Sequence, residues 1–252
     1  MMLPDKPTPP KRELWEHSLS IFGPAKRGKT RLGSKVPKSV FLSTEPGQNA
    51  IECYKVTIDS WSTFLSACNE LARGDHDFRS IIIDSIDGAW QLCSQHICER
   101  NRVACEADLP YGRGYALVLT EFQRVLNRLA QLNYGLVLLG QSELEEVKTP
   151  TGSYHRNVPC LKDKARRFVS GLVDFLFFAD LETLPGPDGK PVLQPVLRTK
   201  ASLLWDSGDR TGLLPPTIPM SYPALVAAFE EAMAARDASD SLNQTQSQGE
   251  EQ

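Results

Sequence analysis

The residues best suited to chemistry lie between Gly23 and Thr30, where the sequence reads GPAKRGKT. In the spacing G-x-x-x-x-G-K-T, the glycines let the loop wrap so that successive backbone N–H groups point at phosphate oxygens. Lys29 is placed to reach the β and γ phosphates, and the Thr30 hydroxyl is placed to ligate Mg²⁺. The sequence therefore predicts a loop for a nucleoside triphosphate, formed by Gly23, Pro24, Ala25, Lys26, Arg27, Gly28, Lys29, Thr30 and Arg31.

Two carboxylates follow apolar runs that are typical of buried strands. Asp84 comes directly after Ile81–Ile83, and at the carboxyl end of a parallel strand it would face the loop and hold Mg²⁺. The next residue is Ser85 rather than Glu, so a base that activates water has to come from elsewhere. Glu45, at the end of VFLSTE, is the candidate; the alternative is a solvated turn residue.

A charged segment follows Gln141, which ends the apolar run GLVLLGQ. The Gln141 side chain could sense the γ-phosphate, or it could be an ordinary hydrogen-bonded strand end. The segment starts acidic and becomes basic, and a flexible basic loop could hold the backbone of single-stranded DNA while an aromatic ring stacks on a base. A solvated charged loop is the alternative. The candidate DNA-binding residues are Lys148, Tyr154, Arg156, Lys162, Lys164, Arg166 and Arg167.

The elements that must position these residues alternate between strands and helices. This alternation predicts an α/β fold with a mainly parallel sheet flanked by helices. The segments 173–184 and 192–200 flank PGPDGKP and predict a C-terminal antiparallel hairpin, and 222–238 predict a closing amphipathic helix. Strands are predicted near 18–22, 39–44, 54–58, 80–84 and 134–141, and helices from about 28 and over 60–74, 89–106 and 114–132.

Composition limits the remaining possibilities. The 252 residues carry a net charge of −3, so any site for a polyanion has to be a local patch. We predict a disordered lead-in over 1–13, one domain over 14–236 and a disordered acidic tail over 237–252. No apolar run reaches about 18 residues and no secretory signal is evident, which predicts a cytoplasmic protein without a membrane span. The spacing of Cys93, His96, Cys98 and Cys105 does not suit zinc, and reduced thiols are the simpler interpretation.

Several motifs together resemble one family. GPAKRGKT, FLSTEPG, SIIIDSID, GLVLLGQ and DSGDRTG, spread over about residues 17–230, are similar to the phage-encoded, single-domain RecA-like P-loop ATPases of the AAA type. This family includes single-strand-annealing recombinases that act with single-stranded-DNA-binding protein. The resemblance implies a RecA-like P-loop NTPase core that uses ATP and Mg²⁺. It further implies that Glu45 activates the attacking water and that Gln141 links nucleotide state to DNA.

The resemblance also implies assembly. A late basic residue, Lys200 or Arg210, would reach the ATP of a neighbouring subunit in a ring or filament. A structural Asp209–Arg210 pair is the alternative from the residues themselves. The predicted function is a phage recombination ATPase of the bacterial host cytoplasm that binds single-stranded DNA and promotes annealing or strand pairing. A nucleotide-dependent switch or partner-binding module of phage replication, and a helicase or packaging-type motor, remain open.

Overall fold

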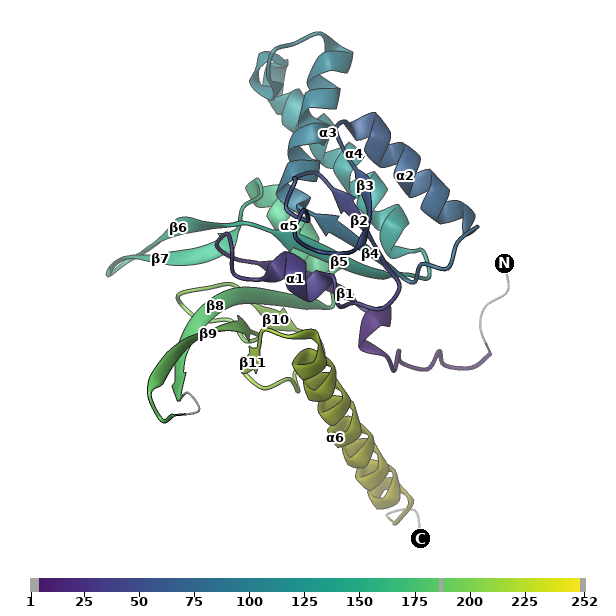
Figure 1. Ribbon diagram of the computed structural model, residues 1–252, viewed down its shortest axis with the longest axis vertical. Helices are drawn as coiled ribbons and strands as arrows, with labels where there is room; N and C mark the ends of the chain where they lie inside the picture. The colour runs from purple at the N-terminus through teal and green to yellow at the C-terminus, as the bar shows by residue number, and fades with distance from the viewer. Residues whose placement is uncertain (1–4, 186–187, 250–252) are drawn as a thin grey trace.

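The computed structural model describes residues 5–185 and 188–249 (Figure 1). A twisted sheet runs through the middle of the molecule, and helices cover both of its faces. One apolar cluster joins the sheet to α2 (Trp61–Arg73), α3 (Ile86–Asn101), α4 (Arg113–Ala130) and α5 (Asp163–Leu172). A second cluster, on the other face, includes residues of η1 (Leu14–Glu16), α1 (Lys29–Gly33) and α6 (Tyr222–Gly249).

Within the described residues the main sheet has nine strands, in the order β11-β9-β8-β1-β5-β4-β2-β3, with β10 paired to β8. The pairs from β8 through β1, β5, β4 and β2 to β3 are parallel, and β9, β10 and β11 pair antiparallel. This topology confirms the predicted fold class, including the C-terminal hairpin and closing helix. The strands are β1 (Ser18–Phe22), β2 (Ser39–Ser43), β3 (Tyr54–Thr57), β4 (Ser80–Asp84), β5 (Gly135–Gly140), β8 (Phe175–Pro185), β9 (Pro191–Arg198), β10 (Gly208–Asp209) and β11 (Thr217–Pro219).

Local sequence patterns account for the buried strands and for the ends of the helices. Every residue of β2, β4 and β5 is buried, because helices cover both faces of the sheet. This burial explains the continuous apolar sequences of these strands. Helix α2 begins where the Ser60 side chain accepts a hydrogen bond from the Thr63 N–H, and ends at Gly74, which has the left-handed φ of 78°. Two short 3₁₀ segments, η2 (Glu106–Asp108) and η3 (Pro110–Gly112), connect α3 to α4.

The prediction of a flexible basic loop after Gln141 is wrong. The segment forms an antiparallel hairpin of β6 (Ser142–Thr149) and β7 (Gly152–Pro159), followed by α5. In β6 every side chain is exposed or half-buried and none is fully buried. Backbone hydrogen bonds from the Asn157 N–H to the Leu204 carbonyl (2.7 Å) and from the Asp206 N–H to the Asn157 carbonyl (3.0 Å) tie the hairpin to the segment before β10.

Helix α6 extends beyond the predicted end of the domain. It continues to Gly249, through most of the predicted disordered tail, because no Pro or Gly interrupts residues 224–248. In Figure 1 its second half projects away from the sheet. Residues 5–13 contain no helix or strand, whereas 1–4 and 250–252 lie outside the described residues. In the part of the chain that the structure describes, no helix combines the length and apolarity that crossing a membrane requires.

Gly135 allows the start of β5 to pass close to the backbone of η1. A Cβ atom at this position would lie 1.8 Å from the Trp15 carbonyl oxygen, so the backbone would have to move. We expect Gly135→Ala to lower the free energy of unfolding by about 1–3 kcal/mol. Gly171→Ala in α5 is the control, because a Cβ there meets nothing within 4 Å and alanine is expected to stabilise the helix by roughly 0.4–1 kcal/mol. Urea unfolding of both variants checks this, and equal stabilities would contradict it.

Candidate nucleotide-binding site

The predicted phosphate loop lies between the end of β1 and the start of α1. Gly28 precedes α1 with a φ of 98°, a conformation that favours glycine. In the described part of the chain, none of the backbone N–H groups from Ala25 to Arg31 donates a hydrogen bond. These free donors fit a group rich in oxygen acceptors, as a triphosphate is.

The Lys29 ammonium lies over this loop. It donates hydrogen bonds to the carbonyl oxygens of Gly23 (2.7 Å) and Pro24 (2.8 Å), and the residue is only 7% exposed. Burial lowers the pKa of Lys29, while the nearby carboxylates, first among them Asp84, act in the opposite direction. The loop therefore holds a cation where a phosphate could replace its two carbonyl partners.

Asp84 lies at the carboxyl end of β4, as predicted, beside the loop. Its Oδ2 atom accepts hydrogen bonds from the Thr30 hydroxyl (2.9 Å) and from the Gln48 side-chain amide (2.7 Å). Burial raises the pKa of Asp84, and these two hydrogen bonds act in the opposite direction. Thr30 and Asp84, the two predicted metal-holding residues, are therefore brought together. A hydroxyl and a carboxylate are oxygen ligands of the kind Mg²⁺ prefers.

Glu45 lies just beyond the end of β2, next to the start of α3. Its Oε1 atom accepts a 2.5 Å hydrogen bond from the Ser85 hydroxyl. Ser85 is also the N-cap of α3, where its side chain accepts from the Gly88 N–H. The Thr44 hydroxyl donates to the Ser85 carbonyl (3.1 Å) and accepts from the Ser85 N–H (2.9 Å). Glu45 is thus an exposed carboxylate that is oriented toward the site, not only a solvated turn residue.

Sequence reasoning missed Asp87 and Gln48. Asp87 Oδ1 accepts a hydrogen bond from the Gln141 backbone N–H (3.1 Å), and its Oδ2 lies 3.2 Å from the Ser85 hydroxyl. Gln141 is therefore connected to the site through its backbone. The sequence did carry a signal for Asp87, since a second carboxylate follows Asp84 by three residues at the start of a helix. For Gln48 it carried none, because a glutamine in a turn has no distinguishing pattern.

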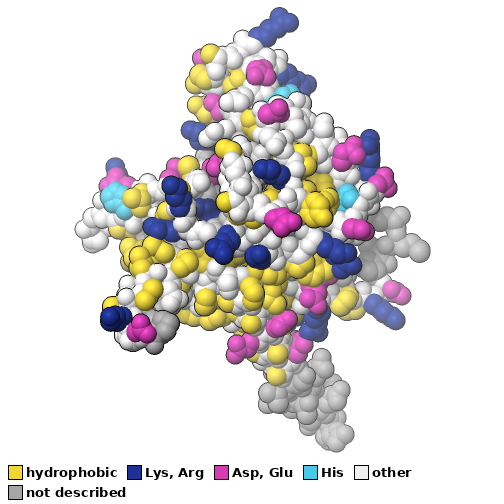
Figure 2. Space-filling view, in the orientation of Figure 1, with side chains coloured by type: hydrophobic (Ala, Val, Ile, Leu, Met, Phe, Trp, Pro, Cys, Tyr) yellow, Lys and Arg dark blue, Asp and Glu magenta, His cyan; other side chains and the backbone are white. Residues whose placement is uncertain are grey.

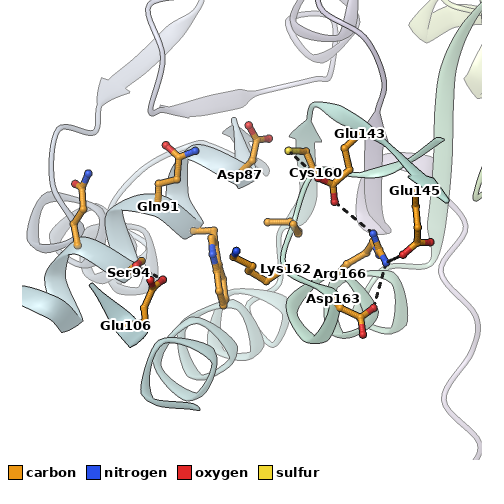
Figure 3. A pocket seen from close by; sticks show the side chains of 13 residues that line it. Asp87, Gln91, Ser94, Glu106, Glu143, Glu145, Cys160, Lys162, Asp163 and Arg166 are labelled. Atoms are coloured by element: carbon orange, nitrogen blue, oxygen red, sulfur yellow. Dashed lines mark hydrogen bonds and ion pairs between the residues drawn. The ribbon is translucent and has the colours of Figure 1, made fainter. Parts of the chain in front are cut away.

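A cavity of about 660 Å³ lies between α3, α5 and the base of β6 (Figure 3). Asp87 lines it together with Lys162 and Arg166, so two of the predicted DNA-binding residues share a cavity with a neighbour of Ser85. Most of its charged lining is acidic. Its walls are formed by Asp87, Trp90, Gln91, Ser94, Gln95, Glu106, Glu143, Glu145, Cys160, Leu161, Lys162, Asp163 and Arg166.

All three of the predicted DNA-binding arginines have carboxylate partners, and the exposed Arg167 pairs with Asp163 (2.9 Å). Arg166 is 8% exposed and forms ion pairs with Glu143 (3.5 Å), Asp163 (3.2 Å) and Glu145 (Figure 3). Arg156 pairs with Glu145 (3.2 Å) and with Asp206 (3.4 Å). The structure places the remaining predicted residues at the surface: Tyr154 is half-buried, and the exposed ones are Lys148, Lys162, Lys164 and Arg167.

Lys200 and Arg210 lie away from the phosphate loop of their own chain. β10, which precedes Arg210, pairs with the first residues of β8, whereas the loop follows the last residue of the parallel strand β1. Arg210 donates to Asp174 (3.3 Å) and to the Gly171 carbonyl (2.5 Å). Lys200 donates to Asp209 (3.1 Å), so an Asp209–Arg210 pair is not the arrangement observed.

A second cavity, of about 720 Å³, opens beside the phosphate loop. Basic side chains from the loop and α1 form one side of it, and apolar side chains from the region of β9 and the start of α6 form the other. In the view of Figure 2, Lys and Arg side chains gather near the centre of the molecule, and a hydrophobic band lies below them. The lining residues are Lys26, Arg27, Gly28, Arg31, Leu32, Lys35, Pro195, Met220, Ser221, Tyr222 and Pro223.

The environment of Asp87 predicts a pH-dependent cost to stability. Burial raises the pKa of Asp87, so the folded protein binds that proton more tightly than the unfolded chain does. Ionised Asp87 therefore destabilises the fold at neutral pH, and this effect disappears as the pH falls through the raised pKa to below the ordinary carboxyl pKa. We expect Asp87→Asn to raise the free energy of unfolding at pH 7.5 by roughly 0.5–2 kcal/mol, with a smaller gain near pH 4.

Denaturant unfolding at the two pH values measures this difference. Asp77→Asn, at an exposed carboxylate, is the control and is expected to change little at either pH. A loss of stability in Asp87→Asn at pH 7.5 would show that its hydrogen bonds outweigh the cost of burying its charge.

Comparisons with known proteins place the chain in a family. The chain is 24% identical over 130 residues to the SPbeta prophage-derived uncharacterized protein YorG of Bacillus subtilis (strain 168), an alignment that covers 49% of this chain and 40% of that relative. The crystal structure of flagellar accessory protein FlaH from Methanocaldococcus jannaschii aligns with a TM-score of 0.38 at 12% identity, covering 73% of this chain and 77% of that one. The model of the AAA domain family matches residues 16–211, most of the chain. With the phosphate loop and Asp84 in place, the chain belongs to the AAA domain family and carries an AAA-type P-loop ATPase domain.

Proposed function

We propose that this protein binds Mg-ATP at the loop of residues 23–30, hydrolyses it, and uses the nucleotide to control single-stranded DNA during phage recombination, promoting annealing or strand pairing. One observation supports the ATPase activity in this proposal. Four side chains lie close together at the carboxyl ends of β1, β2 and β4, namely those of Lys29, Thr30, Asp84 and Glu45. The prophage origin of a relative supports the phage setting.

Each residue of the site has a role in this proposal. The free N–H groups of the loop and Lys29 bind the phosphates, and the adjoining cavity, with Tyr222 in its wall, takes the adenosine. Thr30 and Asp84 hold Mg²⁺, which supplies charge neutralisation at the transferred phosphoryl group. Glu45 orients the attacking water and accepts its proton. Ser85 fixes the Glu45 carboxylate through the 2.5 Å hydrogen bond.

A chain of contacts supports coupling to DNA. Glu45 contacts Ser85, Ser85 lies next to Asp87, and Asp87 holds the backbone of Gln141, the residue before β6. A displacement of Glu45 on hydrolysis therefore reaches the root of the β6–β7 hairpin. Exposed cations of the hairpin and of α5 contact the phosphates of single-stranded DNA in this proposal, namely Lys148, Lys162, Lys164 and Arg167.

Assembly is also part of the proposal. In a ring or filament, Lys200 or Arg210 would act on the ATP of a neighbouring subunit, and each would first have to release its partner, Asp209 or Asp174. A partnership with single-stranded-DNA-binding protein stays a prediction from the sequence resemblance.

A second candidate function is a nucleotide-dependent switch that binds a protein partner. It is favoured by the ion pairs of Arg156 and Arg166, because cations that are paired with carboxylates are less available to a phosphate backbone. DNA-dependent hydrolysis separates the two candidates, since a switch turns over ATP slowly whether or not DNA is present.

Two substitutions test the ATPase site. We expect Lys29→Ala to lose Mg-ATP binding, because it removes the buried cation of the loop, and Glu45→Gln to keep binding while turnover falls by about 10²–10⁴-fold. Binding is measured with a fluorescent ATP analogue and turnover by phosphate release. Glu52→Gln is the control, since this carboxylate is exposed and lies outside the site. Normal turnover in Glu45→Gln would remove Glu45 from its role.

A third substitution tests the DNA part. We expect single-stranded DNA to stimulate hydrolysis, and Lys164→Glu to reduce both the stimulation and the steepness of its salt dependence, because a phosphate contact is lost. Lys190→Glu, an identical charge change at the exposed β8–β9 turn, is the control. Hydrolysis that does not respond to DNA in the wild type would favour the switch.

A further inference from the structure

Gln48 is a buried polar residue that the phosphate-loop motif does not account for. It lies three residues after Glu45, in the turn that follows β2, and is only 2% exposed. Its neighbours Gly47 and Asn49 are exposed, so the chain turns this one side chain inward. A backbone hydrogen bond from the Ile51 N–H to the Gln48 carbonyl (3.0 Å) fixes the turn.

Only the nitrogen of the Gln48 side-chain amide makes a hydrogen bond. Its Nε2 donates a 2.7 Å hydrogen bond to Asp84 Oδ2, whereas its Oε1 is buried with no hydrogen-bond partner in the described chain. The nitrogen has to be the end that faces Asp84, because a carboxylate accepts hydrogen bonds and repels an amide oxygen. A buried amide with an unsatisfied oxygen costs more than an apolar side chain of similar size. A contribution to fold stability alone therefore does not explain why a glutamine is buried at position 48.

The two oxygens of the Asp84 carboxylate have different surroundings. Oδ2 receives both the Thr30 hydroxyl and the Gln48 amide, and Oδ1 accepts no hydrogen bond from the described residues. With its proton donated to Oδ2, the Thr30 hydroxyl keeps its lone pairs for a cation. Two donors on one oxygen also prevent rotation of the carboxylate, which leaves Oδ1 available to the water shell of a metal.

We propose that Gln48 is a positioning residue of the magnesium site: its amide holds the Asp84 carboxylate so that Oδ1 receives the metal's water shell when Mg-ATP binds. Groups that orient the ligands of a metal contribute measurably to metal affinity although they do not touch the metal. The same turn carries Glu45, so one segment sets both the metal-holding carboxylate and the water-activating one. This inference rests on the Mg-ATP site proposed above.

The test separates metal affinity from fold stability. Binding of a fluorescent ATP analogue is titrated with Mg²⁺ in the full-length protein, for wild type, Gln48→Met and Gln48→Leu. Both substitutions keep a side chain of similar bulk and remove the donor, and the second guards against a failure of the first to fold. Asn49→Leu, at the adjacent exposed position, is the control. Urea unfolding of each variant without nucleotide gives the stability.

We expect the half-saturating Mg²⁺ concentration to rise about 10-fold or more in both Gln48 variants, with little change in Asn49→Leu. Binding of the ADP analogue in EDTA should stay within about twofold of wild type, since the phosphate loop is intact. Unchanged Mg²⁺ dependence in the Gln48 variants would overturn this inference alone, even if their stability fell. If the wild-type protein bound the ATP analogue equally well at every Mg²⁺ concentration, the magnesium site itself would be overturned, and this inference with it.

Discussion

The carboxylate of Asp84 is buried at the end of a central strand, and the rest of the site is arranged around the need to stabilise it. A buried carboxylate is costly unless hydrogen bonds or cations compensate. Thr30 and Gln48 supply two hydrogen bonds, and the Lys29 ammonium adds a favourable charge. Lys29 and Thr30 come from the start of α1, where the phosphate loop ends, and Gln48 comes from the turn after β2. The position of Asp84 therefore holds together segments that are far apart in the sequence.

A second cluster of charges surrounds the base of the hairpin. Arg166 is buried among Glu143, Glu145 and Asp163, and Arg156 shares Glu145. The buried Arg166 of α5 pairs with two carboxylates of β6, so these ion pairs join the hairpin to α5. Asp87 lines the same cavity, and its hydrogen bond from the Gln141 backbone N–H connects the base of the hairpin to the region of Ser85.

The C-terminal third completes the nucleotide-binding region. β8 adds to the sheet in parallel beside β1, and β9 and β11 follow it antiparallel. This arrangement places Pro195, Met220 and Tyr222 next to the basic residues of the loop. Burial raises the pKa of Tyr222, which lines this cavity, to about 12, so its hydroxyl stays neutral.

The sequence by itself determined the α/β fold class, the phosphate loop and the strand that carries Asp84, because each of these depends on local spacing and on continuous apolar runs. It also allowed Glu45 to be selected, since strand ends meet at one edge of a parallel sheet. Only the tertiary structure decided what lies beside them. Gln48, Ser85 and Asp87 acquire roles through contacts across 36, 40 and 54 residues of sequence. The pairing of β6 with β7, and of Arg156 and Arg166 with carboxylates, likewise depends on three-dimensional packing, which charge counts along the chain do not encode.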